Sequence, residues 1–257
     1  MTRVAVAGAT GKVGRLTVAA LEQRGHEVVR ISRSLGLDLA DEDRVREALY
    51  GVEAVVDVTN HPAADRTQAA TRFSETTRGL LAAEVRAGVG HHVLLSIAGL
   101  HRIEGTPHHE GKRCQERLVF SGPVPWTIVP ATQFYDFAAA VAGMNERDGE
   151  TLIPPLLVQP VACSDVAEIL AGIATGPPQG RYPDVAGPDF HDLVDMARRT
   201  HLARRQTVKL IPTWSTAFGV EMAGDILLAG ENAHIAPTTF EQWLAREVKS
   251  NTNRSVP

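Results

Sequence analysis

Residues 3–14 of the chain read RVAVAGATGKVG, and this stretch decides the fold. Its first five residues form an apolar run of strand length, and an amphipathic helical pattern follows over Val13–Arg24. Three glycines lie in the turn between them. Gly8 permits a tight turn, Gly11 lets the backbone approach a diphosphate, and Gly14 allows close packing of the helix on the strand. Because the first N–H groups of a helix attract anions, the stretch predicts a turn that binds the diphosphate of a dinucleotide.

The first half of the chain continues this alternation of strands and helices. Further strands are expected at Glu27–Ser32, Ala54–Val58, His92–Ile97 and Trp126–Val129, with helices at Asp41–Tyr50, Arg66–Ala87 and Pro107–Phe120 between them. Apolar strands separated by helices are typical of a parallel sheet covered on both faces. Right-handed crossovers then give a Rossmann-type doubly wound parallel sheet, so we expect an α/β fold with its Rossmann core at residues 1–131.

The second half of the chain has a different pattern. Strands are expected near Leu156–Ala162, at Arg181–Ala186 and at Gln206–Ile211, with helices at Ser164–Ala174, His191–Leu202, Thr216–Leu228 and Thr238–Val248. Thr238 and Glu241 are spaced as a capping box for the last helix. No linker or repeat separates this half from the first. We therefore expect a single NAD(P)-binding domain in which residues 132–250 mainly form a smaller C-terminal substrate lobe over the carboxyl ends of the strands.

Composition excludes several classes of function. The net charge of −4 is unlike that of a nucleic-acid-binding protein, and no apolar window is long enough to span a membrane. A strand over Thr2–Gly8 leaves no room for a signal peptide. The two cysteines have no metal-ligand or C-x-x-C spacing, which fits a reducing compartment. We expect a cytoplasmic protein with a small-molecule substrate and no nucleic-acid or membrane partner; the sequence does not indicate an oligomeric state.

The residues after the second strand favour NADP over NAD. An NAD site usually places an acidic residue about twenty positions beyond the glycines, on the ribose hydroxyls. This chain has Arg33 there, between Ser32 and Ser34. An arginine can bind a 2′-phosphate in a bidentate manner, and a serine hydroxyl can assist it. NADP is therefore the predicted cofactor, with NAD as the alternative and an ordinary surface arginine as the competing interpretation; Asp38 is placed to meet the adenine edge.

Several segments together resemble a known family. Besides the glycine turn these are LDL (37–39), AVVDVTN (54–60), SIA (96–98), Lys112, WTIVPATQFY (126–135), DVA (165–167) and FEQWL (240–244). In order and spacing they resemble the atypical short-chain dehydrogenases/reductases of the NmrA-like NAD(P)-binding family. The resemblance covers nearly the whole chain and implies an NAD(P)-dependent oxidoreductase. Carried over by position, it implies cofactor contacts at Gly8, Thr10, Gly11, Lys12, Val13, Gly14, Arg33, Asp38, Leu39, Thr59, Asn60, Ser96, Ile97, Lys112, Pro130 and Thr132.

The expected catalytic pair of the family is incomplete. Its reductases place a tyrosine, which donates a proton to the developing alkoxide, four residues before a lysine that holds the nicotinamide ribose. Here Lys112 is present, but His108 occupies the tyrosine position. His108, Lys112 and Ser96 are the catalytic candidates, with Ser96 as a hydrogen-bond partner of a substrate carbonyl or of the nicotinamide.

Three hypotheses follow from the missing tyrosine. In the first, His108 or His109 is a replacement general acid with a pKa near neutrality. In the second, the acceptor is a quinone or similar electrophile whose reduced oxygen needs no strong acid. In the third, catalysis is lost and the protein is an NADP(H)-binding redox sensor that interacts with a protein partner. A plainer interpretation places both histidines on the exposed start of a helix.

Substrate and metal candidates complete the set. Gln133, Phe134, Tyr135 and Trp214, with Phe218, are predicted to line the acceptor site, although such aromatic residues are more often core residues. The histidines have no metal-ligand spacing, so no metal is expected. The sequence thus predicts an NAD(P)H-dependent oxidoreductase that reduces a small organic acceptor, for example a quinone or an aromatic polyketide in a tailoring step.

Overall fold

The computed structural model describes residues 1–147, 149–216 and 218–254, and the chain forms two compact units. The first unit comprises Met1–Ala131 and Cys163–Pro183, and the second comprises Thr132–Ala162 and Asp184–Pro257. The segment 163–183, which carries a helix and a short strand, therefore belongs with the first unit and not with the expected substrate lobe.

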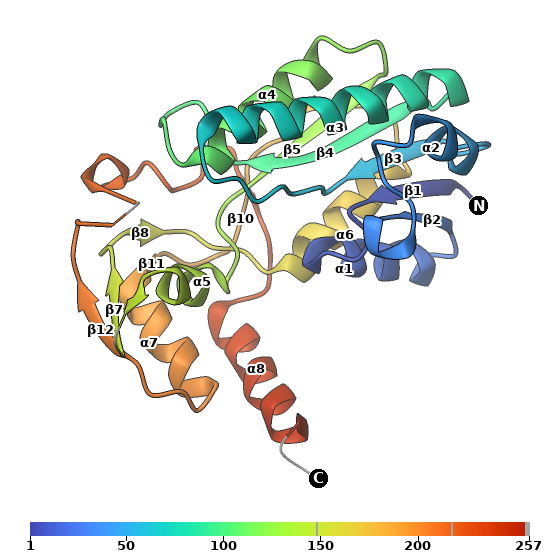
Figure 1. The fold of residues 1–257 in the computed structure, drawn as a ribbon. Coiled ribbons are helices and arrows are strands. Elements are labelled where there is room, and N and C mark those ends of the chain that lie inside the picture. Colours follow the sequence, from blue (N-terminus) through green and yellow to red (C-terminus); the bar gives the residue numbers. More distant parts are fainter. Residues whose placement is uncertain (148, 217, 255–257) are drawn as a thin grey trace. The chain divides into compact units, whose positions relative to one another are not determined.

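The first unit is built on a parallel sheet (Figure 1). Its strands are β1 (Arg3–Ala7), β2 (Glu27–Ile31), β3 (Ala54–Asp57), β4 (His91–Ile97), β5 (Trp126–Ala131) and β9 (Gly180–Arg181). They lie in the order β2-β1-β3-β4-β5-β9, and every pair is parallel. The predicted doubly wound Rossmann-type fold is confirmed. Strand order reverses at β1, between β2 and β3, and ligands of open α/β sheets bind at such a switch point.

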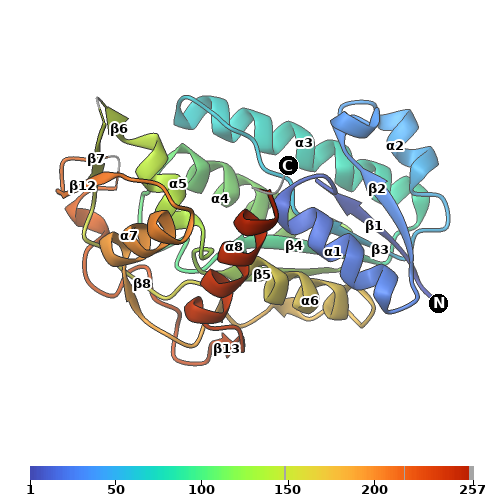
Figure 2. The same ribbon diagram turned by 90° about the horizontal axis from the view of Figure 1, so that it is seen from below.

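Helices cover both faces of this sheet (Figures 1 and 2). Helices α1 (Lys12–Gln23) and α6 (Cys163–Ala174) pack together on one face, and α2 (Glu42–Ala48), α3 (Arg66–Ala87) and α4 (Pro107–Phe120) pack on the other. The apolar strands and helix faces bury a core that includes Ala5, Ala7, Ile31, Val45, Leu49, Val55 and Leu80. Helices α3 and α4 have the predicted bounds. Local features mark where each helix begins. At the start of α3 the Asp65 side chain accepts a hydrogen bond from the Gln68 N–H (2.8 Å), and α4 has Pro107 at its first position.

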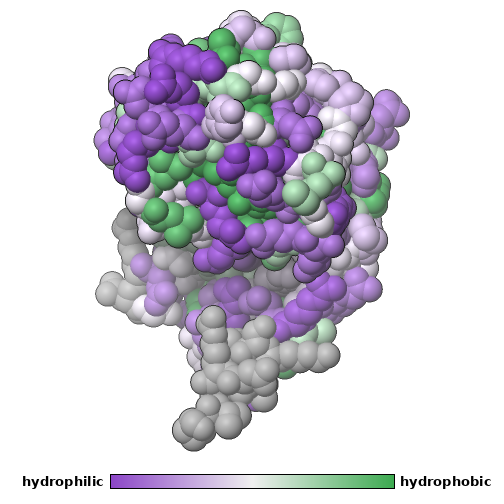
Figure 3. Space-filling model, turned by 90° about the vertical axis from the view of Figure 1, so that its right-hand side faces the viewer, coloured by the Kyte–Doolittle hydropathy of each residue, from purple (hydrophilic) through white to green (hydrophobic). Residues whose placement is uncertain are grey.

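The sheet has a free edge at β2, and charged side chains protect it. Glu27 and Arg30 are exposed on this strand, and Glu27 pairs with Arg3 of β1 (2.9 Å). Charges on an edge strand discourage pairing with other chains. Figure 3 views the right-hand side of Figure 1, where β1 and β2 begin, and hydrophilic side chains cover much of its coloured surface.

The second unit contains short elements. They are α5 (Phe137–Met144), β6 (Glu146–Arg147), β7 (Glu150–Ile153), β8 (Leu157–Val158), β10 (Val185–Ala186), β11 (His191–Asp192), α7 (Leu193–Ala203), β12 (Lys209–Pro212), a 3₁₀ turn η2 (Val220–Met222), β13 (His234–Ile235) and α8 (Phe240–Arg254). Strands β12, β7 and β6 form one small sheet, β11 pairs with β8, and β10 pairs with β13. Across the described ranges, no helix is both long and apolar enough to cross a membrane.

Several expectations for this half were wrong. The helix expected over 216–228 is reduced to the turn η2, since Gly219 and Gly224 flank it and Gly224 has a positive φ of 79°; residue 217 of this range lies outside the described residues. The strand near 156–162 is only β8, and Pro160, which lacks an N–H, lies just beyond it. The strand at 181–186 is divided into β9 and β10, with Pro183 between them. Helix α5 was missed because its apolar sequence FAAAVAGM shows no periodicity.

The cap of the last helix lies one residue later than predicted. The N–H of Gln242 donates to Thr239 Oγ1 (3.2 Å), and the N–H of Thr239 donates to Gln242 Oε1 (3.0 Å), so the capping box joins these two residues. The carbonyl of Thr238 instead accepts a hydrogen bond from the Tyr135 hydroxyl (2.6 Å), which anchors the chain just before the helix.

Candidate functional site

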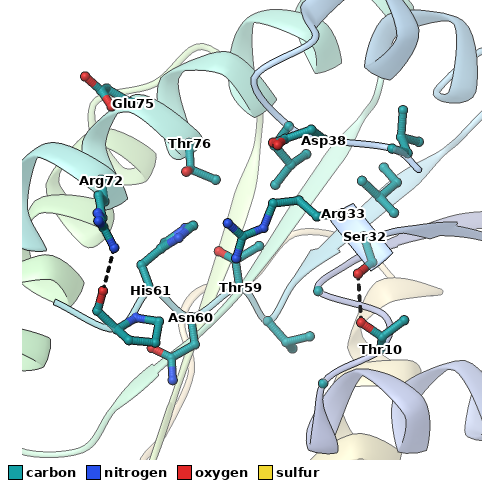
Figure 4. Close-up of a pocket in the computed structure, with 17 residues that line it drawn as sticks. Thr10, Ser32, Arg33, Asp38, Thr59, Asn60, His61, Arg72, Glu75 and Thr76 are labelled. Carbon is teal, nitrogen blue, oxygen red and sulfur yellow. Dashed lines mark hydrogen bonds between the residues drawn. The ribbon is translucent and has the colours of Figure 1, made fainter. Parts of the chain in front are cut away.

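A cleft of about 470 Å³ lies at the carboxyl ends of β1, β2 and β3, at the switch point of the sheet (Figure 4). All of its lining residues belong to the first unit. The end of β2 and the loops after the three strands supply Gly8, Thr10, Gly11, Ile31, Ser32, Arg33, Leu37, Asp38, Leu39, Val58, Thr59, Asn60, His61 and Pro62, and α3 supplies Arg72, Glu75 and Thr76. The structure thus brings together most cofactor residues that the sequence predicted after β1, β2 and β3.

The glycine turn leaves its backbone open to a ligand. Gly8 has a φ of 84°, and a Cβ there would lie 2.9 Å from the carbonyl oxygen of Val58. A Cβ at Gly14 would lie 2.1 Å from the carbonyl oxygen of Gly8, so Gly14 packs the helix on the turn itself and not on the strand. Both glycines are therefore required by backbone contacts.

The start of α1 fits an anion. Gly11 is the N-cap residue, no side chain of the described residues caps the helix, and its first turn carries no acidic residue. Lys12 is exposed, and Val13 belongs to the core with 8% exposure. The positive end of the helix dipole and a backbone without side chains suit a diphosphate.

Three hydroxyls form a cluster beside this turn. Thr10 Oγ1 lies 2.7 Å from Ser32 Oγ and accepts a hydrogen bond from Ser34 Oγ (3.0 Å), while Ser32 Oγ and Ser34 Oγ are 3.0 Å apart. Arg33 stands between the two serines in the 3₁₀ turn η1 (Arg33–Leu35). In Figure 4 its side chain extends across the cleft toward His61. Asp38 lies on the same wall, and its Oδ1 accepts from the N–H of Ala40 (3.1 Å).

A buried network joins the wall of the cleft to α4. Asp57 Oδ1 accepts from the N–H of Thr59 (2.8 Å), and Asp57 Oδ2 accepts from Gln115 Nε2 (2.8 Å). Lys112 Nζ donates to Gln115 Oε1 (2.8 Å), to the Leu95 carbonyl (2.9 Å) and to the Thr59 carbonyl (3.4 Å). Asp57 and Gln115 were not singled out in the sequence, although a carboxylate inside the apolar run AVVDV is a signal that could have found them.

Lys112, the lysine of this network, donates its hydrogen bonds to acceptors within the protein. Burial lowers the pKa of Lys112 to about 8, although Asp57 and Glu116 oppose the shift. An ammonium group has three protons, and the three acceptors above account for them. A ribose hydroxyl would have to replace one of these acceptors to bind Lys112.

The two histidines at the start of α4 differ from the prediction. Burial and the charge of Lys112 lower the pKa of His108 to about 3, and burial and Arg113 lower the pKa of His109 to about 4. His109 Nδ1 accepts from the N–H of Thr106 (3.1 Å) and so caps the helix. Neither imidazole has the near-neutral pKa expected of a replacement acid, because both rings are shielded from water. The plainer expectation of exposed rings was also wrong, since His109 is buried and His108 half-buried.

The remaining predicted residues of the first unit lie at the ends of β4 and β5. Ser96 pairs in register with Pro130, and its Oγ is buried without a hydrogen-bond partner among the described residues. Ile97 is half-buried and Pro130 is buried. An unpaired buried hydroxyl at the carboxyl end of a strand is an atom that a ligand could satisfy.

The predicted substrate residues belong to the second unit, and they differ in exposure. Among them, Gln133 Oε1 is buried without a partner in the described part of the chain. Thr132, which was predicted to contact the cofactor, also belongs to this unit, and its Oγ1 donates to the Gln159 carbonyl (2.6 Å). Phe134 forms an isolated bridge with Val161, and Trp214 is exposed.

Tyr135, which was predicted to contact the substrate, is a core residue. It is 1% exposed, its hydroxyl donates to the Thr238 carbonyl, and its ring packs 5.5 Å from that of Phe240 and 5.8 Å from that of Trp243. Phe218 packs edge-on against Phe137, with their centroids 5.6 Å apart. No group of His, Cys, Asp or Glu side chains that could hold a metal ion occurs in the described part of the chain.

Comparison with known proteins places the chain in a family. The model of the NAD(P)H-binding family matches residues 8–177, which include the glycine turn and every lining residue of the cleft. The chain belongs to the NAD(P)H-binding family. The predicted resemblance and the nicotinamide dinucleotide as cofactor class are thereby confirmed.

One curated relative and two solved structures are similar to this NAD(P)H-binding protein. Photosystem II assembly factor Ycf39 of Synechocystis sp. is 27% identical over 146 residues, which are 51% of this chain and 45% of the relative, so the match spans less than half of that protein. The NADPH-dependent quinone oxidoreductase QOR2 of Escherichia coli superposes with a TM-score of 0.70 at 15% identity, covering 95% of this chain and 98% of the other. Triphenylmethane reductase of Citrobacter sp. has a TM-score of 0.60 at 18% identity, covering 82% and 78%. The two structural matches show a shared fold.

Proposed function

We propose that this protein is an NADPH-dependent oxidoreductase that reduces a small conjugated acceptor of the quinone type. The observation that carries the proposal is the residue at position 108 and its protonation. The glycine turn is open to a dinucleotide, but position 108 holds a histidine in place of the family's tyrosine, and burial and Lys112 lower the pKa of His108 to about 3. A low pKa favours the neutral ring, which is a poor proton donor at physiological pH. A saturated ketone needs such a donor when it becomes an alkoxide, whereas a reduced quinone oxygen is a stabilised phenolate.

Different residues of the cleft would bind different parts of the cofactor and of the acceptor. The bare turn from Gly8 to Gly14 and the start of α1 would hold the diphosphate, and the network of Asp57, Gln115 and Lys112 keeps the Thr59 wall in place. The reduced nicotinamide supplies the hydride when it is bound. The unpaired Ser96 hydroxyl is the group that we assign to a carbonyl of the acceptor or of the nicotinamide.

The preference for NADPH rests on Arg33. Its guanidinium and the hydroxyls of Thr10, Ser32 and Ser34 form a cationic, donor-rich corner of the cleft. A 2′-phosphate has three acceptor oxygens and nearly two negative charges, which this corner can satisfy. No acidic residue takes the place of Arg33 to bind ribose hydroxyls, which supports NADPH over NADH.

The names of the structural neighbours agree with this acceptor class. One is a quinone oxidoreductase and the other reduces triphenylmethane dyes, and both kinds of acceptor are conjugated electrophiles. The polyketide substrates considered from the sequence are a subset of the same chemistry.

The test is a turnover panel. Purified protein with NADPH is given quinones in one set and saturated ketones in another, and oxidation of the cofactor is followed by its absorbance. We expect turnover with quinones and none above background with ketones. Equal activity on both sets would contradict the proposed role of the missing acid.

A second candidate is a non-catalytic NADP(H) sensor that interacts with a protein partner. It is favoured by the full engagement of Lys112 within the protein and by the relative Ycf39, which is an assembly factor. Tight NADPH binding with no turnover across the whole panel would support the sensor and reject the reductase.

A further inference from the structure

The ring of His61 packs against a buried aromatic side chain at the wall of the cleft. It packs edge-on against Phe73, with centroids 5.0 Å apart and planes at 86°. Phe73 is fully buried, and a Cβ at Gly111 of α4 would lie 2.2 Å from its ring, so Phe73 cannot move toward α4. The carbonyl of Pro62, the next residue, accepts from Arg72 Nη1 (2.8 Å). His61 is therefore positioned by packing and not by a hydrogen bond of its own ring.

One nitrogen of this ring lacks a hydrogen-bond partner in the part of the chain that the structure describes. His61 Nε2 is shielded from solvent and forms no hydrogen bond among the described residues. Buried polar atoms are normally paired, and an exception in a ligand cleft points to the ligand as the missing partner. In Figure 4 the His61 ring faces the space that Arg33 reaches from the opposite wall.

The charges around His61 describe the ligand it would accept. Arg33 of η1, Lys112 of α4 and Arg72 of α3 act on it as cations, and Asp57 of β3 is the opposing anion. Burial first, and these cations in addition, lower the pKa of His61, so the free protein holds it neutral near pH 7. A phosphate placed among these groups would cancel the cations and add negative charge beside the ring.

We propose that His61 binds a phosphate group of the dinucleotide through Nε2 and takes up a proton when that phosphate binds. The proposal rests on dinucleotide binding in this cleft, and it adds a residue and a pH dependence to that function. The sign follows from linkage. If the complex holds a proton that the free protein lacks, affinity is constant below the pKa of the free protein. Affinity then falls as pH rises from that value to the pKa of the complex, and is constant again above it.

The test is calorimetric titration of NADH and NADPH in two buffers of different ionisation enthalpy at each pH. NADH is the cleaner probe, because its diphosphate does not titrate near neutrality, whereas the 2′-phosphate of NADPH has a pKa of about 6 and can release its own proton. We expect net proton uptake with NADH and a Kd that rises about tenfold between about pH 6 and pH 8, as linkage to one proton allows. In the His61→Gln variant, which keeps a hydrogen-bonding side chain, uptake should vanish and Kd should become independent of pH.

Proton uptake on binding NADH would assign the His61 contact to the diphosphate. Proton uptake seen only with NADPH would assign the contact to the 2′-phosphate. The control is His26→Gln, since His26 accepts from the Thr2 N–H at the opposite end of β2 and should leave uptake unchanged. An NMR titration of the wild-type His61 imidazole, with and without NADH, tests the same point without a variant and should show a higher pKa in the complex. Undiminished uptake in His61→Gln, or binding heat without uptake in the wild type, would overturn the proposal. Absence of binding heat with either dinucleotide would overturn the dinucleotide function itself.

Discussion

At the scale of single residues, the glycine turn tolerates little change of its backbone. In Gly14→Ala the new methyl would meet the carbonyl oxygen of Gly8 at 2.1 Å, so the turn must distort. We expect loss of NADPH binding by calorimetry and a loss of about 1–3 kcal/mol in the free energy of unfolding. The matched control is Gly143→Ala, also in a helix but with open space around its Cβ, which should raise stability by about 0.5–1 kcal/mol and leave binding unchanged.

Arg33 is the residue that distinguishes the two nicotinamide dinucleotides. Removing its guanidinium in Arg33→Ala should weaken NADPH binding about 10- to 100-fold, as expected for a charged hydrogen bond of about 1.5–3 kcal/mol, and should change NADH binding by less than about twofold. Kd values for both dinucleotides check this. Arg30→Ala is the control, because Arg30 is exposed on β2 and pairs with Glu22 outside the cleft. Equal losses for NADH and NADPH would place Arg33 elsewhere on the cofactor.

At the scale of elements, the buried network ties the ends of β3 and β4 to α4, and its lysine gives a pH dependence with a defined sign. The folded protein lowers the pKa of Lys112 from 10.5 to about 8, so between these values the unfolded chain binds more protons than the folded one. The Lys112 contribution to the free energy of unfolding therefore rises across this window, by up to about 1.4 kcal/mol for each unit of pH.

Urea unfolding of the wild type and of Lys112→Met at several pH values measures this contribution. We expect the variant to lack the rise between about pH 8 and pH 10.5 that the wild type shows. Parallel pH profiles for the two proteins would mean that Lys112 keeps an ordinary pKa in the folded state.

Local patterns explain why some elements were predictable from the sequence and others were not. Helices α3 and α4 were predicted with their bounds, because each has a strong local start signal and lies between apolar strands. The short strands of the second unit have no such pattern and depend on contacts from distant segments. The network of Asp57, Gln115 and Lys112 joins separate elements, and the unpaired nitrogen of His61 depends on Phe73, so neither could be derived from spacing along the chain. The same limit applies to Tyr135, whose partner Thr238 is 103 residues away.

At the scale of the whole molecule, a substitution of Tyr135 is expected to lower the stability of the protein and to leave ligand binding unchanged. Tyr135→Phe keeps the ring contacts with Phe240 and Trp243 and removes the hydrogen bond to the Thr238 carbonyl. We expect a loss of about 1 kcal/mol in the free energy of unfolding and no change in KM for the acceptor or for NADPH. A raised KM for the acceptor at unchanged stability would indicate that Tyr135 contacts the substrate.

The two compact units are built from interleaved segments, and this has a consequence for synthesis on the ribosome. Helix α6, which covers the face of the sheet next to α1, is made only after residues 132–162, the opening segment of the other unit. Until Val166 and Leu170 emerge, the nascent sheet keeps an apolar face open to water and to other chains. Synthesis from the N-terminus therefore leaves this face of the cofactor-binding unit uncovered while residues 132–162 are made.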